Sequence, residues 1–206
     1  MNIFKLIAGL FVSRKPDVSV SLRNASNVAS ANHEKDKVVI NLEGFNYDFE
    51  SDFIQEVLGL IDNRKEIKIQ REDPSGIEEN FIQLGMKHGE NDGEVLIDLM
   101  GNDFFATEDV FLPLVAGFLS EGLTVLVDLS TLTKIPAEVR AYSVASDDGP
   151  VDPDFVFSRS SLETLRMQKG IDIEVIKQTV RRIPSYLSPS NKVKVDTYYV
   201  FKLKED

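Results

Sequence analysis

Four short aliphatic strings recur along the chain at nearly constant spacing, and this recurrence limits the possible folds more than any other feature. Residues 38–42, 95–99 and 125–129 share one pattern, in which an aliphatic run is followed by Asn or Asp and then Leu, and residues 67–69 lie between the first two. The strings begin 28 to 30 residues apart, which is the length of one β-strand plus one crossover helix. The sequence therefore predicts an α/β fold with a mostly parallel central sheet built from repeated β-α units.

Helical spacing of apolar residues fills the gaps between the strings. Residues 53–61 place an apolar stripe on one face, and a second helix is expected to open at Ser75 and to continue through Leu84. A third helix begins between Thr107 and Pro113, since proline is tolerated in a first turn, and Gly122 stands where a left-handed C-cap would lie. This third helix is apolar on nearly all sides, so we expect it to be the most buried.

The outer parts of the chain differ from this repeat. Residues 1–36 are interpreted as an N-terminal amphipathic helix followed by a linker, and residues 37–206 as a single α/β domain, with the β-α repeats in 37–130. The helix is expected to dock on the domain or on a partner, with contact to a membrane surface as the alternative. Residues 131–206 form a C-terminal extension, in which we expect helices after Ser160 and over 173–183. The extension ends in an antiparallel strand over 192–204 at the sheet edge.

The composition excludes several classes of function. The chain has no Cys and only two His, so thiol chemistry and a multi-histidine zinc site are excluded, and nothing points to an oxidising compartment. A net charge of −11 argues against nucleic-acid binding. The apolar run near the N-terminus is too short for a membrane span. We therefore expect a cytoplasmic protein without a cofactor, and the sequence leaves its oligomeric state open.

Acidic residues near strand ends suggest one enzymatic alternative. Asp98 and Asp128 occupy matching positions in two of the strings, and Asp103 follows in the next loop. Ligands of open α/β sheets bind beyond the carboxyl ends of the strands, and carboxylate oxygens suit Mg²⁺. These residues would then serve a magnesium-dependent phosphotransferase or hydrolase. A structural role for the two Asp is the other interpretation, because Asn41 takes the same position in the first string.

A short segment after the second string resembles a known regulatory motif. Residues 73–77, Asp-Pro-Ser-Gly-Ile, are similar to the Asp-Ser-Ser/Thr-Gly-Leu motif of STAS domains, the module of anti-sigma-factor antagonists and sulfate transporters. The resemblance implies regulation by phosphorylation at a helix N-terminus, although Pro74 stands where the phosphorylated Ser lies in that family. Ser75 and Glu78 also form a capping box, which explains the same residues without any switch.

A stiff acidic loop supports the function that we favour from the sequence. Asp147, Asp148, Asp152 and Asp154 lie around two prolines, and a rigid acidic loop suits recognition of a basic partner with little loss of entropy. Glu72 and Asp73 are second candidates for the same contact. Sparse catalytic residue types and strong negative charge favour a non-enzymatic binding protein of the antitoxin or immunity-protein type, which engages a basic protein.

Overall fold

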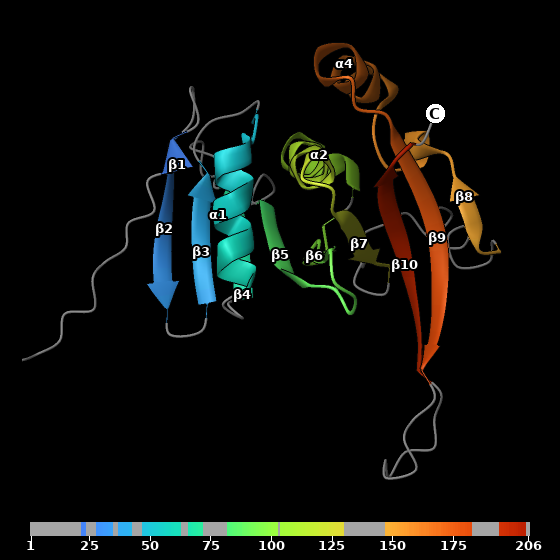
Figure 1. Ribbon diagram of the computed structural model, residues 1–206, viewed down its shortest axis with the longest axis horizontal. Helices are drawn as coiled ribbons and strands as arrows, with labels where there is room; N and C mark the ends of the chain where they lie inside the picture. The colour runs from blue at the N-terminus through green and yellow to red at the C-terminus, as the bar shows by residue number, and fades with distance from the viewer. Residues whose placement is uncertain are drawn as a thin grey trace, which may run out of the picture.

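The structure is a computed structural model, and it describes residues 22–23, 28–34, 37–42, 47–62, 66–71, 82–102, 104–129, 147–182 and 194–204. Within these residues ten strands form one sheet, in the order β1-β2-β3-β4-β5-β6-β7-β10-β9-β8 (Figure 1). The strands are β1 (Leu22–Arg23), β2 (Val28–Glu34), β3 (Lys37–Leu42), β4 (Glu66–Arg71), β5 (Ile82–His88), β6 (Glu94–Asp98), β7 (Thr124–Asp128), β8 (Gly149–Val151), β9 (Ile173–Arg182) and β10 (Lys194–Leu203). The helices are α1 (Ser51–Asp62), α2 (Phe104–Ser120) and α4 (Arg159–Lys169), with the 3-10 turn η4 (Pro153–Phe155).

The α/β class is confirmed, but the sheet is mixed, and the prediction of a mostly parallel sheet is wrong. Among the described strands, only β3 with β4 and β6 with β7 pair in parallel, and the other neighbours are antiparallel. Residues 95–99 and 125–129 are therefore parallel neighbours, as predicted. The difference arises at β5, because this strand runs back between β4 and β6 where a crossover helix was expected.

The first seven strands contain two units of the same topology. In each unit an antiparallel hairpin is followed by a helix and by a strand parallel to the second strand of the hairpin: β2-β3-α1-β4, then β5-β6-α2-β7. The shared string pattern aligns Leu42 with Leu99, and the strand registers then align Arg71 with Leu129. Corresponding positions of the two units can therefore be compared directly.

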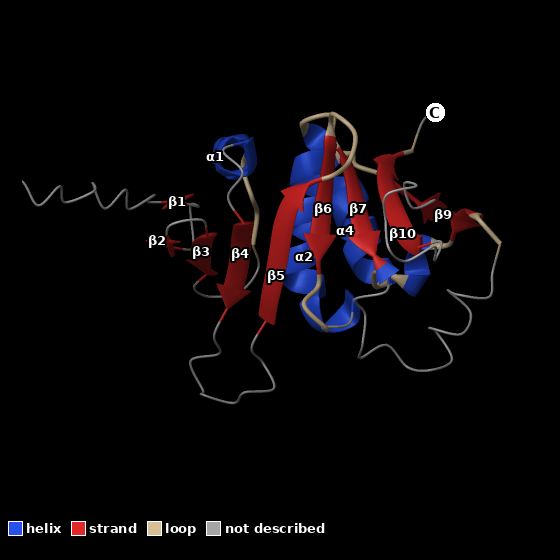
Figure 2. Cartoon of the chain, turned by 90° about the horizontal axis from the view of Figure 1, so that it is seen from below, coloured by secondary structure: helices blue, strands red, loops and turns tan. Residues whose placement is uncertain are grey.

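One face of the sheet carries the core. The inward row crosses seven strands in register through Val38, Ile67, Met86, Ile97, Val127, Tyr199 and Lys177. α2 lies behind β5, β6 and β7 in Figure 2, and Phe111, Val115 and Phe118 in this helix are fully buried, which confirms the expected burial. Each such side chain contributes about 2–3 kcal/mol of transfer free energy. Gly117 lets α1 approach α2, because a Cβ there would lie 2.6 Å from Ile54 Cδ1.

Several sequence predictions for individual elements are corrected. Leu84 lies in strand β5 instead of a helix, and residues 173–182 form β9 instead of a helix. The C-terminal strand is present as β10, but it lies between β7 and β9 and not at an edge. Part of the expected linker forms β2. α2 begins at Phe104, before the predicted start, so Pro113 lies in the helix interior and not in the first turn. The predicted N-terminal helix lies outside the described residues.

The ends of two helices follow the sequence signals. Gly122 after α2 and Gly170 after α4 have positive φ angles of 78° and 67°, as the left-handed C-cap requires. α4 begins slightly earlier than predicted from Ser160, because its N-cap is Ser158, whose side chain accepts a hydrogen bond from the Ser161 amide. In the part of the chain that the structure describes, no helix is long and apolar enough to cross a membrane.

Candidate functional site

Asp98 and Asp128 lie side by side, as the sequence predicts for the carboxyl ends of two parallel strands. They are the last residues of β6 and β7 and directly follow Ile97 and Val127, which are partners in the parallel register. Alternation along the strands places both on the sheet face opposite to α2. Asp98 Oδ1 accepts a hydrogen bond of 2.8 Å from the amide of Met100, whose φ angle is 52°. One of the two carboxylates therefore stabilises the turn that follows β6.

The described residues do not supply the rest of a metal site around this pair. No group of three or more His, Cys, Asp or Glu side chains in the described ranges is placed to hold a metal ion. Asp103, the third predicted ligand, lies outside those ranges. Two carboxylates alone are few ligands for Mg²⁺, which demands octahedral coordination by oxygens.

The predicted acidic loop lies around β8, at one edge of the sheet (Figure 1). Asp147, Asp148, Asp152 and Asp154 are all exposed. Asp148 Oδ2 accepts from the Thr179 amide at 3.1 Å, next to the last β8–β9 pair, and Asp152 caps η4 by accepting from the Asp154 amide. Two of the four carboxylates thus have a structural role.

The remaining predicted residues lie in a segment that the structure does not describe. Glu72, Asp73 and the capping box of Ser75 with Glu78 lie between β4 and β5, outside the described ranges. The strand β5 itself, antiparallel to β4, takes the place of the later part of the helix that the STAS resemblance implies after the motif. Within the described residues, β4 and β5 are therefore antiparallel neighbours in the sheet.

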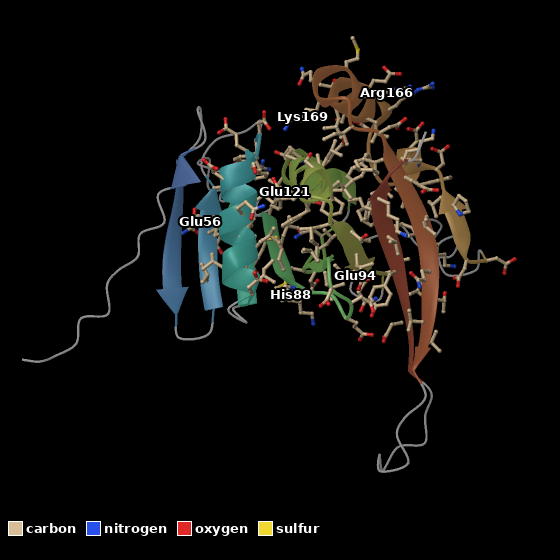
Figure 3. All side chains as sticks on the ribbon, in the orientation of Figure 1. Glu56, His88, Glu94, Glu121, Arg166 and Lys169 are labelled. Carbon is tan, nitrogen blue, oxygen red and sulfur yellow. The ribbon has the colours of Figure 1, made fainter. Side chains whose placement is uncertain are left out.

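A more continuous acidic surface, which the sequence analysis missed, lies on and around α1. Between residues 47 and 62 there are five Asp or Glu and no Lys or Arg, and all five acidic side chains are exposed. Asp48 pairs with Lys169 and Asp62 with His88. Glu121, at the end of α2, accepts hydrogen bonds from Ser51 Oγ and Gln55 Nε2 at the start of α1. We name Glu50, Asp52, Glu56 and Glu121 the α1 acidic face, and Figure 3 labels two of its members.

Two details of this helix have no packing explanation. Gly59 lies on the exposed side of α1, where an added Cβ would meet no atom within 4 Å, although glycine inside a helix lowers stability by about 0.5–1 kcal/mol relative to alanine. Glu56 follows Asp52 by one turn, so their charges repel, and partial loss of hydration raises the pKa of the Glu56 carboxyl although its side chain is exposed. A helix position without a side chain, beside exposed carboxylates, suits close approach by a cationic surface.

A second candidate site is a cleft of about 730 Å³ on the helical side of the sheet, between α2 and α4. We name it the α2–α4 cleft. Its lining combines residues of α2 and α4 with the segment before α1 and the end of β4: Tyr47, Asp48, Arg71, Glu108, Asp109, Leu112, Pro113, Ser160, Ser161, Thr164, Leu165, Gln168 and Lys169. It lies at the carboxyl end of a parallel strand, where open α/β sheets bind ligands.

Charged side chains close the floor of this cleft. The side chain of Arg71 is 9% exposed and forms an ion pair with Asp109 of α2. Burial raises the pKa of Tyr47 above its ordinary value of 10.0; the positive charge of Arg71 and a hydrogen bond with it oppose this rise, and the charge of Asp109 adds to it. Tyr47 thus stays protonated next to a buried ion pair at neutral pH.

Polar contacts also hold α4 over the cleft. At its C-terminal end Lys169 forms an ion pair with Asp48, and Lys169 extends from α4 toward α1 in Figure 3. At its N-terminal end Glu108 Oε1 accepts from the amide and the hydroxyl of Ser158, at 2.9 and 2.8 Å. Leu165 is the buried residue of this helix. The helix is therefore held by a narrow apolar contact and by polar contacts at both ends.

The sequence contained a signal for the acidic face but little for the cleft. The absence of Lys and Arg from residues 47–62 is visible in the sequence. The cleft joins residues that are up to 122 positions apart, from Tyr47 to Lys169, and only the fold brings them together. A smaller hollow of about 350 Å³ lies beside the β5–β6 hairpin, lined in part by Leu96, Leu126 and Asp128.

Three comparisons, with protein-family models, with curated proteins and with solved structures, found no match for this chain.

Proposed function

We propose that this protein is a non-enzymatic binding protein that engages a basic protein partner through the α1 acidic face, as an antitoxin or immunity protein engages its target. The observation that supports this most directly is the run of five exposed carboxylates without Lys or Arg in residues 47–62. Among the described side chains, none forms an ion pair with Glu50, Asp52 or Glu56, so the field of these carboxylates extends into solvent. This field would attract a basic surface before contact.

Charge of this kind acts on the rate and specificity of association more than on final affinity. Complementary potentials raise association rates, and single exposed ion pairs contribute only about 0–1 kcal/mol each. Gly59 adds a place where a partner can contact the helix backbone without a side chain between them. The proposal therefore combines electrostatic attraction over the whole face with close contact at one point.

Matched charge variants test where the partner binds. The first variant combines Asp52→Asn with Glu56→Gln, and the control combines Asp147→Asn with Asp154→Asn at the β8 edge, so each loses two negative charges. Tagged proteins are used to capture partners from lysate at low and at moderate salt, and the captured proteins are identified by mass spectrometry. Association rates of the purified partner are then measured against salt concentration.

We expect a basic partner that associates about tenfold more slowly with the α1 variant than with wild type at low salt, while the β8 control behaves as wild type. Loss of binding in the control alone would assign the contact to the acidic loop around β8. A captured partner that is not basic, or a rate that does not change with salt, would contradict the proposal.

A further inference from the structure

The floor of the α2–α4 cleft carries a charge that the packing of the sheet does not require. In the register of the sheet Arg71 lies between Leu42 and Ile82, both of which are buried. The corresponding position of the second unit is Leu129, which is also buried. An apolar residue therefore satisfies this position elsewhere in the same chain. Burying a guanidinium has a large desolvation penalty that its ion pair only offsets, so the presence of Arg71 suggests a role toward a ligand.

The cleft presents charges of both signs to whatever enters it. The pair of Arg71 with Asp109 lies at the floor, and the pair of Lys169 with Asp48 lies nearer the rim. The side chains of Asp109, Lys169 and Asp48 remain 37%, 34% and 65% exposed, so a ligand can reach them. Hydroxyl and amide groups of α4 complete the polar part of the lining, and Leu112, Pro113 and Leu165 form an apolar part.

We propose that the α2–α4 cleft binds a small zwitterion with one carboxylate and one ammonium group, as in a free amino acid. Its volume of about 730 Å³ lies within the range of small-molecule sites, roughly 300–1,000 Å³. Arg71 and Lys169 would receive the carboxylate, and Asp109 and Asp48 the ammonium group. A purely anionic ligand would be repelled by three carboxylates, those of Asp48, Glu108 and Asp109, and attracted by only two cations. A zwitterion replaces both halves of an ion pair at once and leaves no charge uncompensated.

This inference is independent of the basic partner, because the residues of the α1 acidic face do not line the cleft. Calorimetric titration of the full chain with glycine, L-leucine, L-glutamate and L-lysine is the direct test. Acetate and ethylammonium serve as half-ligands that carry one charge each, and maltose serves as an uncharged polyol. We expect at least one amino acid to bind about tenfold more tightly than either half-ligand, a difference of about 1.4 kcal/mol in binding free energy.

Two variants and one matched control locate the bound molecule without changing the residues at the floor of the cleft. Lys169→Gln removes a rim cation and is expected to weaken amino-acid binding about tenfold. Arg166→Gln is the matched control, because Arg166 lies outside the cleft lining and extends away from the body on the other side of α4 (Figure 3). Thr164→Trp fills the cleft from an exposed position of α4, so it is expected to abolish binding while the melting temperature stays near that of wild type.

Four results would overturn the inference. These are the absence of heat with every amino acid, binding of maltose in place of amino acids, equal affinity for the half-ligands, and unchanged binding in Thr164→Trp. Amide shifts in ¹⁵N-labelled protein provide a second readout, because residues 160–169 should respond to the ligand while residues of α1 beyond Ser51 should not. Failure of this test leaves the basic-partner experiment unaffected, since that experiment depends on other side chains.

Discussion

Gln70 of β4 donates a hydrogen bond of 2.6 Å to Asn41 of β3. In the second ββαβ unit the same two positions hold Asp98 and Asp128, so two carboxylates stand where the first unit has a bonded pair of amides. Neighbouring like charges on a sheet face repel each other unless a donor or cation compensates. The Met100 amide supplies such a donor to Asp98.

Replacing this carboxylate pair by amides should stabilise the protein. For Asp98→Asn combined with Asp128→Gln we expect the free energy of unfolding to rise by about 1 kcal/mol. The repulsion between the carboxylates is removed, and a hydrogen bond between side-chain amides, like that of the first unit, can form. Urea denaturation measures the change. The same titration in millimolar MgCl₂ should leave the wild type unchanged. Stabilisation of the wild type alone by magnesium would instead support the metal-dependent enzyme.

Glycines in the two long helices should respond to alanine in opposite directions. Gly59→Ala is expected to raise the free energy of unfolding by about 0.5–1 kcal/mol, because the helix interior gains rigidity and the new Cβ meets no neighbour. Gly117→Ala is expected to lower it by about 1–3 kcal/mol, because its Cβ would collide with the buried Ile54 side chain. Thermal unfolding of both variants decides this. Destabilisation by Gly59→Ala would show that the glycine has a structural role.

Replacing Asp109 and replacing Arg71, the two partners of the buried ion pair, should lower the free energy of unfolding by different amounts. Asp109→Ala leaves the guanidinium of Arg71 buried without its carboxylate, and we expect a loss of about 2 kcal/mol, less than for a fully buried pair because Asp109 is 37% exposed. Arg71→Leu places an apolar residue between Leu42 and Ile82, so its loss should be smaller. Urea denaturation of the two single variants and the double variant gives the coupling free energy between the two side chains. A larger loss in Arg71→Leu would contradict this account.

Stability should fall at alkaline pH partly because of Tyr47. Burial raises the pKa of this phenol above 10.0 in the folded protein, so above about pH 10 the unfolded chain releases the proton first. The unfolded state then binds fewer protons than the folded state, and the free energy of unfolding decreases as pH rises. Urea titrations between neutral pH and pH 11 should show a smaller decrease for Tyr47→Phe. Parallel curves for the two proteins would mean that Tyr47 titrates normally.

Short continuous aliphatic runs and long segments with helical spacing of apolar residues were predictable from the sequence. The strings at 38–42, 95–99 and 125–129 and the helix over 53–61 appear where expected, whereas α2 begins earlier than predicted, at Phe104. β9 was mistaken for a helix because it is a strand with apolar residues on both faces. Ile173 and Val175 point to the core, whereas Ile176 and Val180 lie on the opposite face, and together they imitate helical spacing.

The candidate sites divide in the same way. Adjacency of Asp98 and Asp128 followed from the repeat, since matching positions on parallel strands meet at one end of a sheet. Whether the two carboxylates bind a metal or have a structural role could not be judged from the sequence, because the hydrogen bond from the Met100 amide to Asp98 depends on the geometry of the turn. The ion pairs that line the cleft connect residues 38 and 121 positions apart, and no local pattern indicates such pairs.

By itself, the sequence determined the α/β class, the buried helix α2 and the two β-α-β crossovers, because local hydrophobic periodicity and helix-end residues fix these elements. The tertiary structure alone decided that β5 runs antiparallel between β4 and β6, that β10 enters the sheet beside β7, and that Arg71 contacts Asp109. The reason is that strand order and cleft geometry depend on contacts between distant segments, whose free energy is shared among many residues and leaves no periodic trace in the chain.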